Sequence, residues 1–266
     1  GVDPFHQAHS FVRGHWSKSA DSTPMIIAKC SHDTDYLAWL MNSPCKSVSS
    51  YGRLSYFKEA NAPEGAATRC TSACPHAAPA GGSCMYDAHR YLNQHSRWLD
   101  MVYPDPGQRT DEEVLEWLKT SPWGRCAWKC DNDVVDHQVV NMDFANGGTA
   151  SLTMTAFDFG RTLEIFGTRA SLRGGDAHLV NSGHDISIRD HASGETTHLK
   201  LDAYADDESK GHGGGDFGLV DSMDRIFRGE SSEGSLIENA VEGVLIGLAA
   251  EQSRLANGRV VEIAQD

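Results

Sequence analysis

The chain has 266 residues, of which 39% are hydrophobic and 23% charged, which suffices for one large domain or two small ones with a substantial core. A formal net charge of −14 disfavours binding to the phosphate backbones of nucleic acids. No apolar run approaches the ~18 residues of a membrane span, and no signal segment opens the sequence. Seven cysteines cannot all pair with one another, so we expect free thiols and a reducing, cytoplasmic setting.

The first part of the chain is expected to alternate strands and helices. The loosely alternating segment His6–Trp16 predicts a strand. Ser31 suits the N-cap of a helix that continues to about residue 42, because acidic residues such as Asp35 would lie in its positive first turn. The segment Ser47–Phe57 predicts a second strand.

A long segment without apolar periodicity follows. Between Asn61 and Cys84 the sequence is dominated by Ala, Gly, Pro, Ser and Cys, which predicts a long loop. A long loop in a compact domain is usually functional or held in place by other groups. Short helices are expected at about 85–95 and at 111–120, the second capped by Thr110.

The centre of the chain consists of short, β-prone segments separated by Gly, Asn or Asp. Asn146-Gly147-Gly148 predicts a hairpin. Helices are expected at 216–228 and 236–257, with Gly258 as a C-terminal cap, before a last strand at 259–263. This order predicts an α+β fold, a large, open, mainly antiparallel mixed sheet with helices packed on one face. The seven central strands are expected at 134–144, 149–157, 161–166, 171–173, 178–181, 185–189 and 196–201.

Lys29, His32 and Asp35 are the candidates for proton transfer. At a helix N-terminus, His and Lys can be held in neutral forms that accept a proton near pH 7. His32 and Asp35 are three residues apart, so they can share one helical face. Oxidation of an alcohol by hydride transfer needs a base for the hydroxyl proton, which this cluster could supply. The alternative is a capped helix with acidic residues in its first turn and a surface lysine.

The cysteines of the long loop and of the following segment predict a metal site. Two Cys-x-x-x-Cys pairs and one further thiol suit a tetrahedral zinc ion. The expected ligands of this structural zinc are Cys70, Cys74, Cys84 and Cys130. Such a site would explain how the loop is held. Small buried thiols, or disulfides in an oxidising compartment, are the alternatives.

Three residues of the chain are candidates for substrate binding near the predicted sheet. Arg13 and Trp16 could frame a sugar, because Trp stacks on rings and Arg donates hydrogen bonds. His137, at the entry to the sheet, is a polar group that needs a partner where it is buried. An ordinary edge strand and a solvated strand end are the alternatives.

The glycine-rich segment 211–216 is not a nucleotide-binding fingerprint, because it follows an acidic loop and lacks the lysine of a P-loop. Its consecutive glycines allow close backbone approach to a ligand, so His212 and Asp216 are further candidates for substrate binding. The alternative is a flexible loop that ends in an Asp helix cap. No Gly-x-Gly-x-x-Gly motif lies between a strand and a helix anywhere in the chain.

Six segments, in order, resemble the C-terminal domain of the Gfo/Idh/MocA family, which includes glucose–fructose oxidoreductase and inositol dehydrogenase. The resemblance covers nearly the whole chain. It implies that residues 1–266 are one substrate-binding and catalytic domain with a Cys-rich insertion at about 61–130. It also implies an N-terminal Rossmann domain for NAD or NADP, absent from this chain. The segments are 9–16 (HSFVRGHW), 29–35 (KCSHDTD), 61–66 (NAPEGA), 130–137 (CDNDVVDH), 166–170 (FGTRA) and 211–216 (GHGGGD).

The resemblance places His32 at the family's catalytic histidine. Inositol dehydrogenase-like members carry an aspartate four residues earlier, where this chain has Ala28, and we expect Lys29 to take over proton transfer. The implied function is the substrate-binding half of an NAD(P)-dependent oxidoreductase for a sugar, cyclic polyol or related hydroxyl compound, inactive as this chain alone. The implied assembly is a homo-oligomer formed through the sheet. The alternatives are an NAD-dependent glycosidase of the same family, or a non-enzymatic carbohydrate-binding or assembly module.

Overall fold

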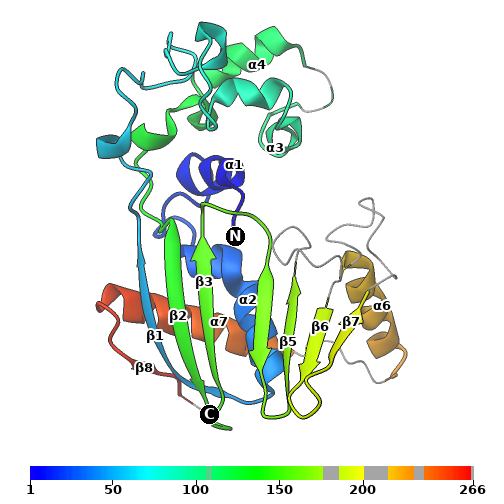
Figure 1. The fold of residues 1–266 in the computed structure, drawn as a ribbon. Coiled ribbons are helices and arrows are strands. Elements are labelled where there is room, and N and C mark those ends of the chain that lie inside the picture. The colour runs from blue at the N-terminus through cyan, green and yellow to red at the C-terminus, as the bar shows by residue number, and fades with distance from the viewer. Residues whose placement is uncertain (106, 108, 176–185, 201–214, 231–236, 265–266) are drawn as a thin grey trace. The chain divides into compact units, whose positions relative to one another are not determined.

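The structure is a computed structural model that describes residues 1–105, 107, 109–175, 186–200, 215–230 and 237–264 (Figure 1). The chain divides into two compact units, the first formed by Gly1–Phe159 with Glu238–Asp266 and the second by Gly160–Ile237. Within the described ranges, no helix is long and apolar enough to cross a membrane.

The first unit contains a four-stranded antiparallel sheet in the order β3-β2-β1-β8. Its strands are β1 (Cys45–Arg53), β2 (His137–Phe144), β3 (Thr149–Thr155) and β8 (Val261–Glu262). Its helices are α1 (Pro4–His6), the π-helix η1 (Gln7–Val12), α2 (Met25–Met41), α3 (Ser96–Asp100), α4 (Asp111–Leu118) and α7 (Ile237–Leu255). Short 3₁₀ helices are η2 (Glu59–Asn61), η3 (Ala78–Ala80), η4 (Ala88–Leu92), η5 (Pro122–Gly124) and η6 (Ala127–Lys129).

Helices α2 and α7 cover one face of this sheet (Figure 1). Ile26 of α2 and Ile246 of α7 are fully buried in the same apolar cluster as Val140 and Met142 of β2. Successive strand residues point to opposite faces, so Val139, the residue before Val140, is exposed. This period of two explains why the sequence predicts the strand well.

Glycines let α2 and α7 approach closely. A Cβ atom at Gly243 of α7 would lie 2.9 Å from the Asp35 backbone of α2, too near for either helix to remain in place. We therefore expect Gly243→Ala to lower the free energy of unfolding by about 1–3 kcal/mol through overpacking, although alanine favours helix formation. Urea unfolding followed by circular dichroism measures the change.

The matched control for this substitution is Gly218→Ala in α6 (Gly215–Phe227), because a Cβ atom there meets nothing within 4 Å. At this position only the gain in helix propensity changes the stability, and it raises the free energy of unfolding by up to about 1 kcal/mol. If both substitutions stabilised the protein equally, the close approach of α2 and α7 would be refuted.

The segment between β1 and β2 builds a core of its own, although it contains little regular structure. Tyr91 and Leu118 are fully buried, and Phe5 of α1 meets the Tyr91 ring edge-on with centroids 5.1 Å apart. The Cys70 amide donates to the Gly124 carbonyl at 2.9 Å, joining distant parts of the segment. Contacts with the N-terminal helices and internal backbone hydrogen bonds therefore hold this region.

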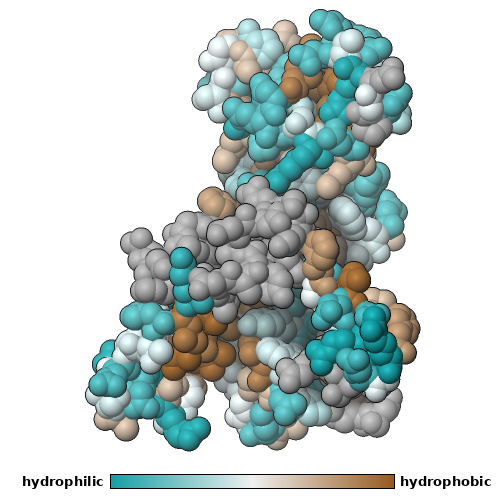
Figure 2. All heavy atoms as spheres, turned by 90° about the vertical axis from the view of Figure 1, so that its right-hand side faces the viewer, coloured by the Kyte–Doolittle hydropathy of each residue, from teal (hydrophilic) through white to brown (hydrophobic). Residues whose placement is uncertain are grey.

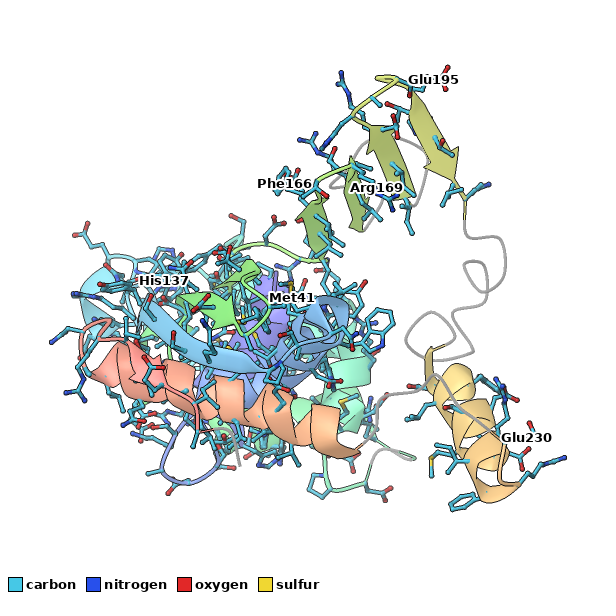
Figure 3. All side chains as sticks on the ribbon, turned by 90° about the horizontal axis from the view of Figure 1, so that it is seen from below. Met41, His137, Phe166, Arg169, Glu195 and Glu230 are labelled. Carbon is cyan, nitrogen blue, oxygen red and sulfur yellow. The ribbon has the colours of Figure 1, made fainter. Side chains whose placement is uncertain are left out.

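The second unit contains a second antiparallel sheet, in the order β4-β5-β6-β7. Its strands are β4 (Thr162–Phe166), β5 (Ala170–Gly175), β6 (Ile186–Asp190) and β7 (Thr196–Leu199), and its helix is α6. Figure 3 shows Phe166 and Arg169 where β4 turns into β5, and Glu195 at the turn before β7. Exposed apolar side chains are common here: Phe217, Val220 and Phe227 of α6 are more than half exposed.

The predicted α+β class is confirmed, with a different division of the strands. Instead of one large sheet, the strands form two four-stranded sheets, both antiparallel in every described pairing. The hairpin at Asn146 is confirmed, with Gly147 at φ 85°. The capping box of Thr110 and Glu113 at the start of α4 is also as expected. The expected strand at 178–181 lies outside the described residues.

The expected strand at His6–Trp16 is wrong. Asp3 accepts a hydrogen bond from the His6 amide at 2.9 Å, and Pro4 is the first helical residue, so both favour a helix start. The helical chain continues through η1, where all six residues are buried. Burial on every side leaves no period by which a helix can be recognised in the sequence. The helix expected at about 85–95 is only partly formed, as η4.

Candidate functional site

Helix α2 begins at Met25, not near Ser31 as expected. The Pro24 carbonyl accepts from the amides of Ile27 and Ala28, and the first residues of the helix are buried in the main core. Residues 29–35 therefore lie inside the helix. Because helix-end electrostatics fall off within the first turn, the expected effect of the N-terminus on His32 does not apply.

Lys29, His32 and Asp35 follow one another at three-residue intervals along α2 and so lie along one side of it. His32 is exposed, whereas Lys29 and Asp35 are half-buried. The Lys29 charge acts on His6 of α1, and Asp35 lies against Gly243 of α7. His32 is therefore the member of the group most accessible to a ligand.

A cavity of about 200 Å³ lies beside η1 in the first unit. Three tryptophans and three histidines dominate its wall, together with a serine and small or flexible apolar residues. Phe11 stacks on Trp16 with ring centroids 5.8 Å apart, and His6 stacks on Trp98 at 4.2 Å, so the aromatic rings brace one another. The lining residues are His6, His9, Ser10, Gly14, His15, Trp16, Trp98, Met101, Val102 and Trp123.

The π-helix positions two of these residues. π-Helical turns are rare and are often found at functional sites. Here η1 carries His9 and Ser10, both almost completely buried, to the cavity wall. The His9 Nδ1 atom lies 2.7 Å from the Tyr91 hydroxyl, which fixes the orientation of the imidazole ring.

Burial keeps two of the cavity histidines, His6 and His9, uncharged. Desolvation, followed by the charge of Lys29, lowers the pKa of His6 to about 4. Desolvation, followed by the neighbouring His6, lowers the pKa of His9 to about 3. Both rings are therefore neutral at pH 7 and can exchange hydrogen bonds with an uncharged ligand.

We expect the protein to lose stability in mild acid because of His9. Its ordinary pKa is about 6.5, so between pH 6.5 and pH 3 the unfolded chain binds one proton more than the folded chain. The free energy of unfolding therefore falls as the pH falls through this window, by up to about 1.4 kcal/mol per pH unit from this group. Urea midpoints at pH 7 and pH 5 measure the loss, and an unchanged slope in the His9→Asn variant would contradict this cause.

Arg13, a predicted substrate residue, is 3% exposed and lies in the interior. Its Nε donates to the Arg125 carbonyl at 2.7 Å, and one terminal nitrogen donates to the Tyr86 carbonyl at 2.6 Å. The same nitrogen lies 3.8 Å from the Cys70 Sγ atom. Arg13 therefore ties the N-terminal helices to the Cys-rich segment, while the neighbouring Trp16, 41% exposed, lines the aromatic cavity.

The structure does not support the predicted zinc site. All seven cysteines are free thiols, and no group of three or more His, Cys, Asp or Glu among the described residues is arranged to hold a metal ion. Cys70, Cys74 and Cys84 line a cavity of only about 20 Å³ together with Cys126, and Cys130 is not part of it. The Arg13 guanidinium beside Cys70 opposes a second cation there. Burial also raises the pKa of Cys70 to about 11, whereas zinc binds thiolates.

His137 begins β2 in the main sheet (Figure 3). Its Nδ1 lies 2.8 Å from Asp136 Oδ1, and its side chain is 43% exposed. Asp136 is fully buried and also accepts from the amides of Ser55 and Tyr56. The carboxylate therefore fixes the end of β1 and the orientation of the His137 ring at once.

The two remaining predicted substrate residues are Asp216, which belongs to the second unit, and His212. Asp216 is exposed in the first turn of α6. His212 lies outside the described residues. Of the predicted substrate residues that the structure describes, only Trp16 lines the aromatic cavity.

Sequence reasoning missed four of the cavity residues, His6, His9, Trp98 and Trp123. In the expected strand His6 and His9 would point to opposite faces. Their spacing of three residues is the available signal, because it places both rings on one side of a helix. Trp98 and Trp123 come from a segment with no periodic pattern, so only the tertiary fold brings them to the same wall.

A match to a protein-family model identifies the family of the chain. Residues 2–254 match the family model described as "Oxidoreductase family, C-terminal alpha/beta domain" of the Gfo/Idh/MocA proteins. The chain belongs to this family. The suspected Gfo/Idh/MocA resemblance is therefore confirmed, and with it the assignment of the chain as a C-terminal domain of oxidoreductases.

Solved Gfo/Idh/MocA proteins share the fold at low identity. Levoglucosan dehydrogenase in complex with NADH and levoglucosan is 15% identical, with a TM-score of 0.51 over 96% of this chain and 54% of that chain. The WlbA dehydrogenase from Bordetella pertussis, in complex with NADH and UDP-GlcNAcA, is 12% identical, with a TM-score of 0.51 over 100% of this chain and 53% of that chain. The myo-inositol 2-dehydrogenase from Lactobacillus plantarum is 13% identical, with a TM-score of 0.48 over 99% and 55%.

The chain thus spans about half the length of these structures. No curated protein matches the sequence. At such identities the likeness establishes the fold, and the catalytic residues of this Gfo/Idh/MocA domain have to be argued from its own side chains.

Proposed function

We propose that this domain is the substrate-binding half of an NAD(P)-dependent oxidoreductase that acts on a sugar, a cyclic polyol or a related hydroxyl compound. The observation that carries the proposal is the family match over residues 2–254 combined with a cavity walled by tryptophan and histidine. Tryptophan faces suit the apolar faces of sugar rings, and imidazole nitrogens suit hydroxyl groups. The related structures in complex with NADH and sugar-type compounds support the same chemistry.

The proposed cofactor is held mainly by a Rossmann domain of the full-length protein. The sequence of this chain has no dinucleotide fingerprint, and its aromatic cavity of about 200 Å³ is smaller than the ~300–1,000 Å³ of pockets for drug-sized ligands. When bound, the nicotinamide would accept or donate the hydride. The residues of this chain would bind the substrate and move its hydroxyl proton.

His32 is proposed as the group that takes or returns this proton. It is the exposed member of the α2 group, and general bases act best when they reach the substrate directly. Lys29, one turn earlier, adds positive charge that favours removal of a proton from a hydroxyl. Asp35 is the third residue on the same side of the helix. Trp16 and His137 are proposed to orient the substrate. The assignment of His212 and Asp216 to substrate binding stays a prediction from the sequence.

Calorimetric titration with NAD(H) and NADP(H) tests the proposed function. We expect the full-length protein to bind one of the cofactors and the 266-residue chain to bind neither. Absence of binding by the full-length protein would overturn the redox function and favour a carbohydrate-binding or assembly module. The titration also decides between NAD and NADP.

The alanine at position 28 favours a second candidate reaction. Inositol dehydrogenase-like relatives have an aspartate at this position, four residues before the histidine, so the proton path of this chain differs from theirs. An NAD-dependent glycosidase, which oxidises, eliminates, adds water and reduces, is the alternative of the same family. Cleavage of a nitrophenyl glycoside that needs NAD but produces no net NADH would establish it, whereas stoichiometric NADH formation from a free sugar supports the dehydrogenase.

The proposed assembly is a homo-oligomer in a cytoplasmic setting. Tyr51 and Val139 are exposed on the sheet of the first unit, on the face opposite to Val140 and the helices. Figure 2 shows brown, hydrophobic side chains gathered in patches between hydrophilic ones on the face in view. Large apolar patches commonly mark protein interfaces. Sedimentation of the full-length protein would test the assembly, and a monomer at micromolar concentration would refute it.

A further inference from the structure

Helix α7 is apolar on two opposite sides. Ile246, Ala249 and Ala250 are buried in the main core, where α7 and α2 cover one face of the first sheet (Figure 1). The outer side of a helix that covers a sheet in this way is usually charged or polar, because it meets water. In α7, apolar residues occupy much of the outer side instead.

Four aliphatic side chains form this outer stripe, at the spacing i, i+3, i+4 and i+7 that places residues on one side of a helix. Each of them is between 39% and 51% exposed in the part of the chain that the structure describes. A helix that is apolar all round is generally buried all round, so we expect a further surface to cover the stripe. The outer stripe consists of Val241, Val244, Leu245 and Leu248.

The charged residues beside the outer stripe are bound within the chain itself. The Glu242 Oε1 atom accepts a hydrogen bond from the Cys45 amide at 2.6 Å. Glu251 pairs with Arg254 at 2.6 Å, and both of these side chains are largely buried. These charges are therefore satisfied without a partner, and the stripe itself offers only aliphatic contacts. The covering surface should accordingly be apolar.

The size of the outer stripe argues against a second copy of the chain as the covering surface. A stable interface between separate proteins buries ~800 Å² on each partner, from ~20–30 residues. Four half-exposed aliphatic side chains supply only a fraction of that area. A surface on the same polypeptide needs less area, because the covalent connection keeps its effective concentration in the millimolar range.

A longer polypeptide would contain such a surface. Levoglucosan dehydrogenase and the WlbA dehydrogenase share the fold, and this chain covers only 54% and 53% of their chains. Val2 lies in the same core cluster as Ile246 of α7, and its amide donates to the Thr155 carbonyl at 2.7 Å. Polypeptide that precedes Val2 would therefore be attached to the unit that contains α7.

We propose that the outer stripe of α7 is the docking surface for the half of the full-length polypeptide that this chain lacks. The inference rests on the proposed function and deepens it, because it names the helix through which the two halves join. The contact is apolar and lies within one polypeptide. The opposite, open face of the sheet stays available for the proposed homo-oligomer.

Thiol labelling of the full-length protein tests whether the stripe is covered. Leu248→Cys is expected to react with a maleimide at least about tenfold more slowly than the control Glu116→Cys, since burial of one leucine shifts the docking equilibrium by about that factor. The Glu116 side chain, on α4, is 72% exposed. Each rate is divided by the rate of the same variant in urea, and the unmodified protein gives the background of the native cysteines. Equal relative rates would overturn the inference.

Photo-cross-linking of the full-length protein identifies the covering surface. Leu248 is replaced by benzoylphenylalanine, the protein is irradiated, and the cross-linked peptides are identified by mass spectrometry. Most cross-links are expected to join α7 to residues that precede this chain in the same polypeptide, at a yield independent of protein concentration. Cross-links mainly to residues 1–266, or a dimer band that grows with concentration, would overturn the inference. The same replacement of Val244 repeats the measurement with an independent variant.

NAD(P) titration of the same protein separates this inference from the proposed function. Cross-links to the preceding half without NAD(P) binding would support the docking surface and overturn the oxidoreductase. NAD(P) binding together with a freely reactive Leu248→Cys variant would overturn the docking surface and leave the oxidoreductase intact.

Discussion

Replacement of His32 by alanine is expected to reduce the turnover of the full-length enzyme by ~10²–10⁴, the usual contribution of a general acid or base. The side chain is exposed on α2, so its removal leaves the packing of that helix on the sheet unchanged. The measurement is steady-state kinetics of the full-length enzyme with a sugar or polyol that it oxidises. We expect kcat to fall while the dissociation constant for NAD(P) stays the same.

Trp39→Ala is the matched control for this variant, because Trp39 is an exposed residue two turns further along the same helix. Its turnover should match that of the unmodified enzyme. Unchanged turnover in His32→Ala would refute the catalytic assignment. A Lys29→Met variant would then show whether the adjacent lysine moves the proton instead.

Replacement of Asp136 by alanine is expected to lower the free energy of unfolding by about 3–5 kcal/mol, as when one partner of a buried polar network is removed. The carboxylate is fully buried and accepts from the Ser55 amide at 2.8 Å, the Tyr56 amide at 2.6 Å and the Ser55 hydroxyl at 3.0 Å. Without it, the backbone amides of Ser55 and Tyr56 lose their acceptor. Urea unfolding followed by circular dichroism measures the loss.

Asp143→Ala is the control for this substitution, since Asp143 lies in β2, the strand that directly follows Asp136, but is 45% exposed and pairs with Lys46 at 2.9 Å. Exposed ion pairs contribute about 0–1 kcal/mol. Similar losses in the two variants would contradict the role of Asp136 as a buried acceptor. Asp136→Asn, which keeps one acceptor oxygen, should lie between them.

Helix α2 shows what sequence reasoning can and cannot locate. The α2 segment is recognised because Lys29, His32 and Asp35 keep helical spacing, and the family resemblance gives His32 its proposed role. The start of the helix could not be found, because it depends on burial of Met25 and Ile26 against the sheet and not on a polar cap. Ser31 has the composition of an N-cap, yet it lies inside the helix.

The zinc prediction shows the opposite case. Cysteine spacing describes only positions along the chain, whereas a metal site requires that the sulfur atoms lie close together in the fold. In the fold, Arg13 comes from a segment about sixty residues before the cysteine pair and places its charge beside Cys70. No pattern within the cysteine segment contains that information.

The sequence by itself determined the α+β class, the alternating strands of the first sheet, the capped helix at Thr110 and the oxidoreductase family, because each depends on local periodicity, local capping or motif order. The tertiary structure alone decided that the strands form two sheets, that residues 4–12 are helical, and that His9, Trp98 and Trp123 share one cavity. The physical reason is burial: a side chain that is enclosed on every side leaves no period in the sequence, and its partners are fixed by packing between segments far apart in the chain.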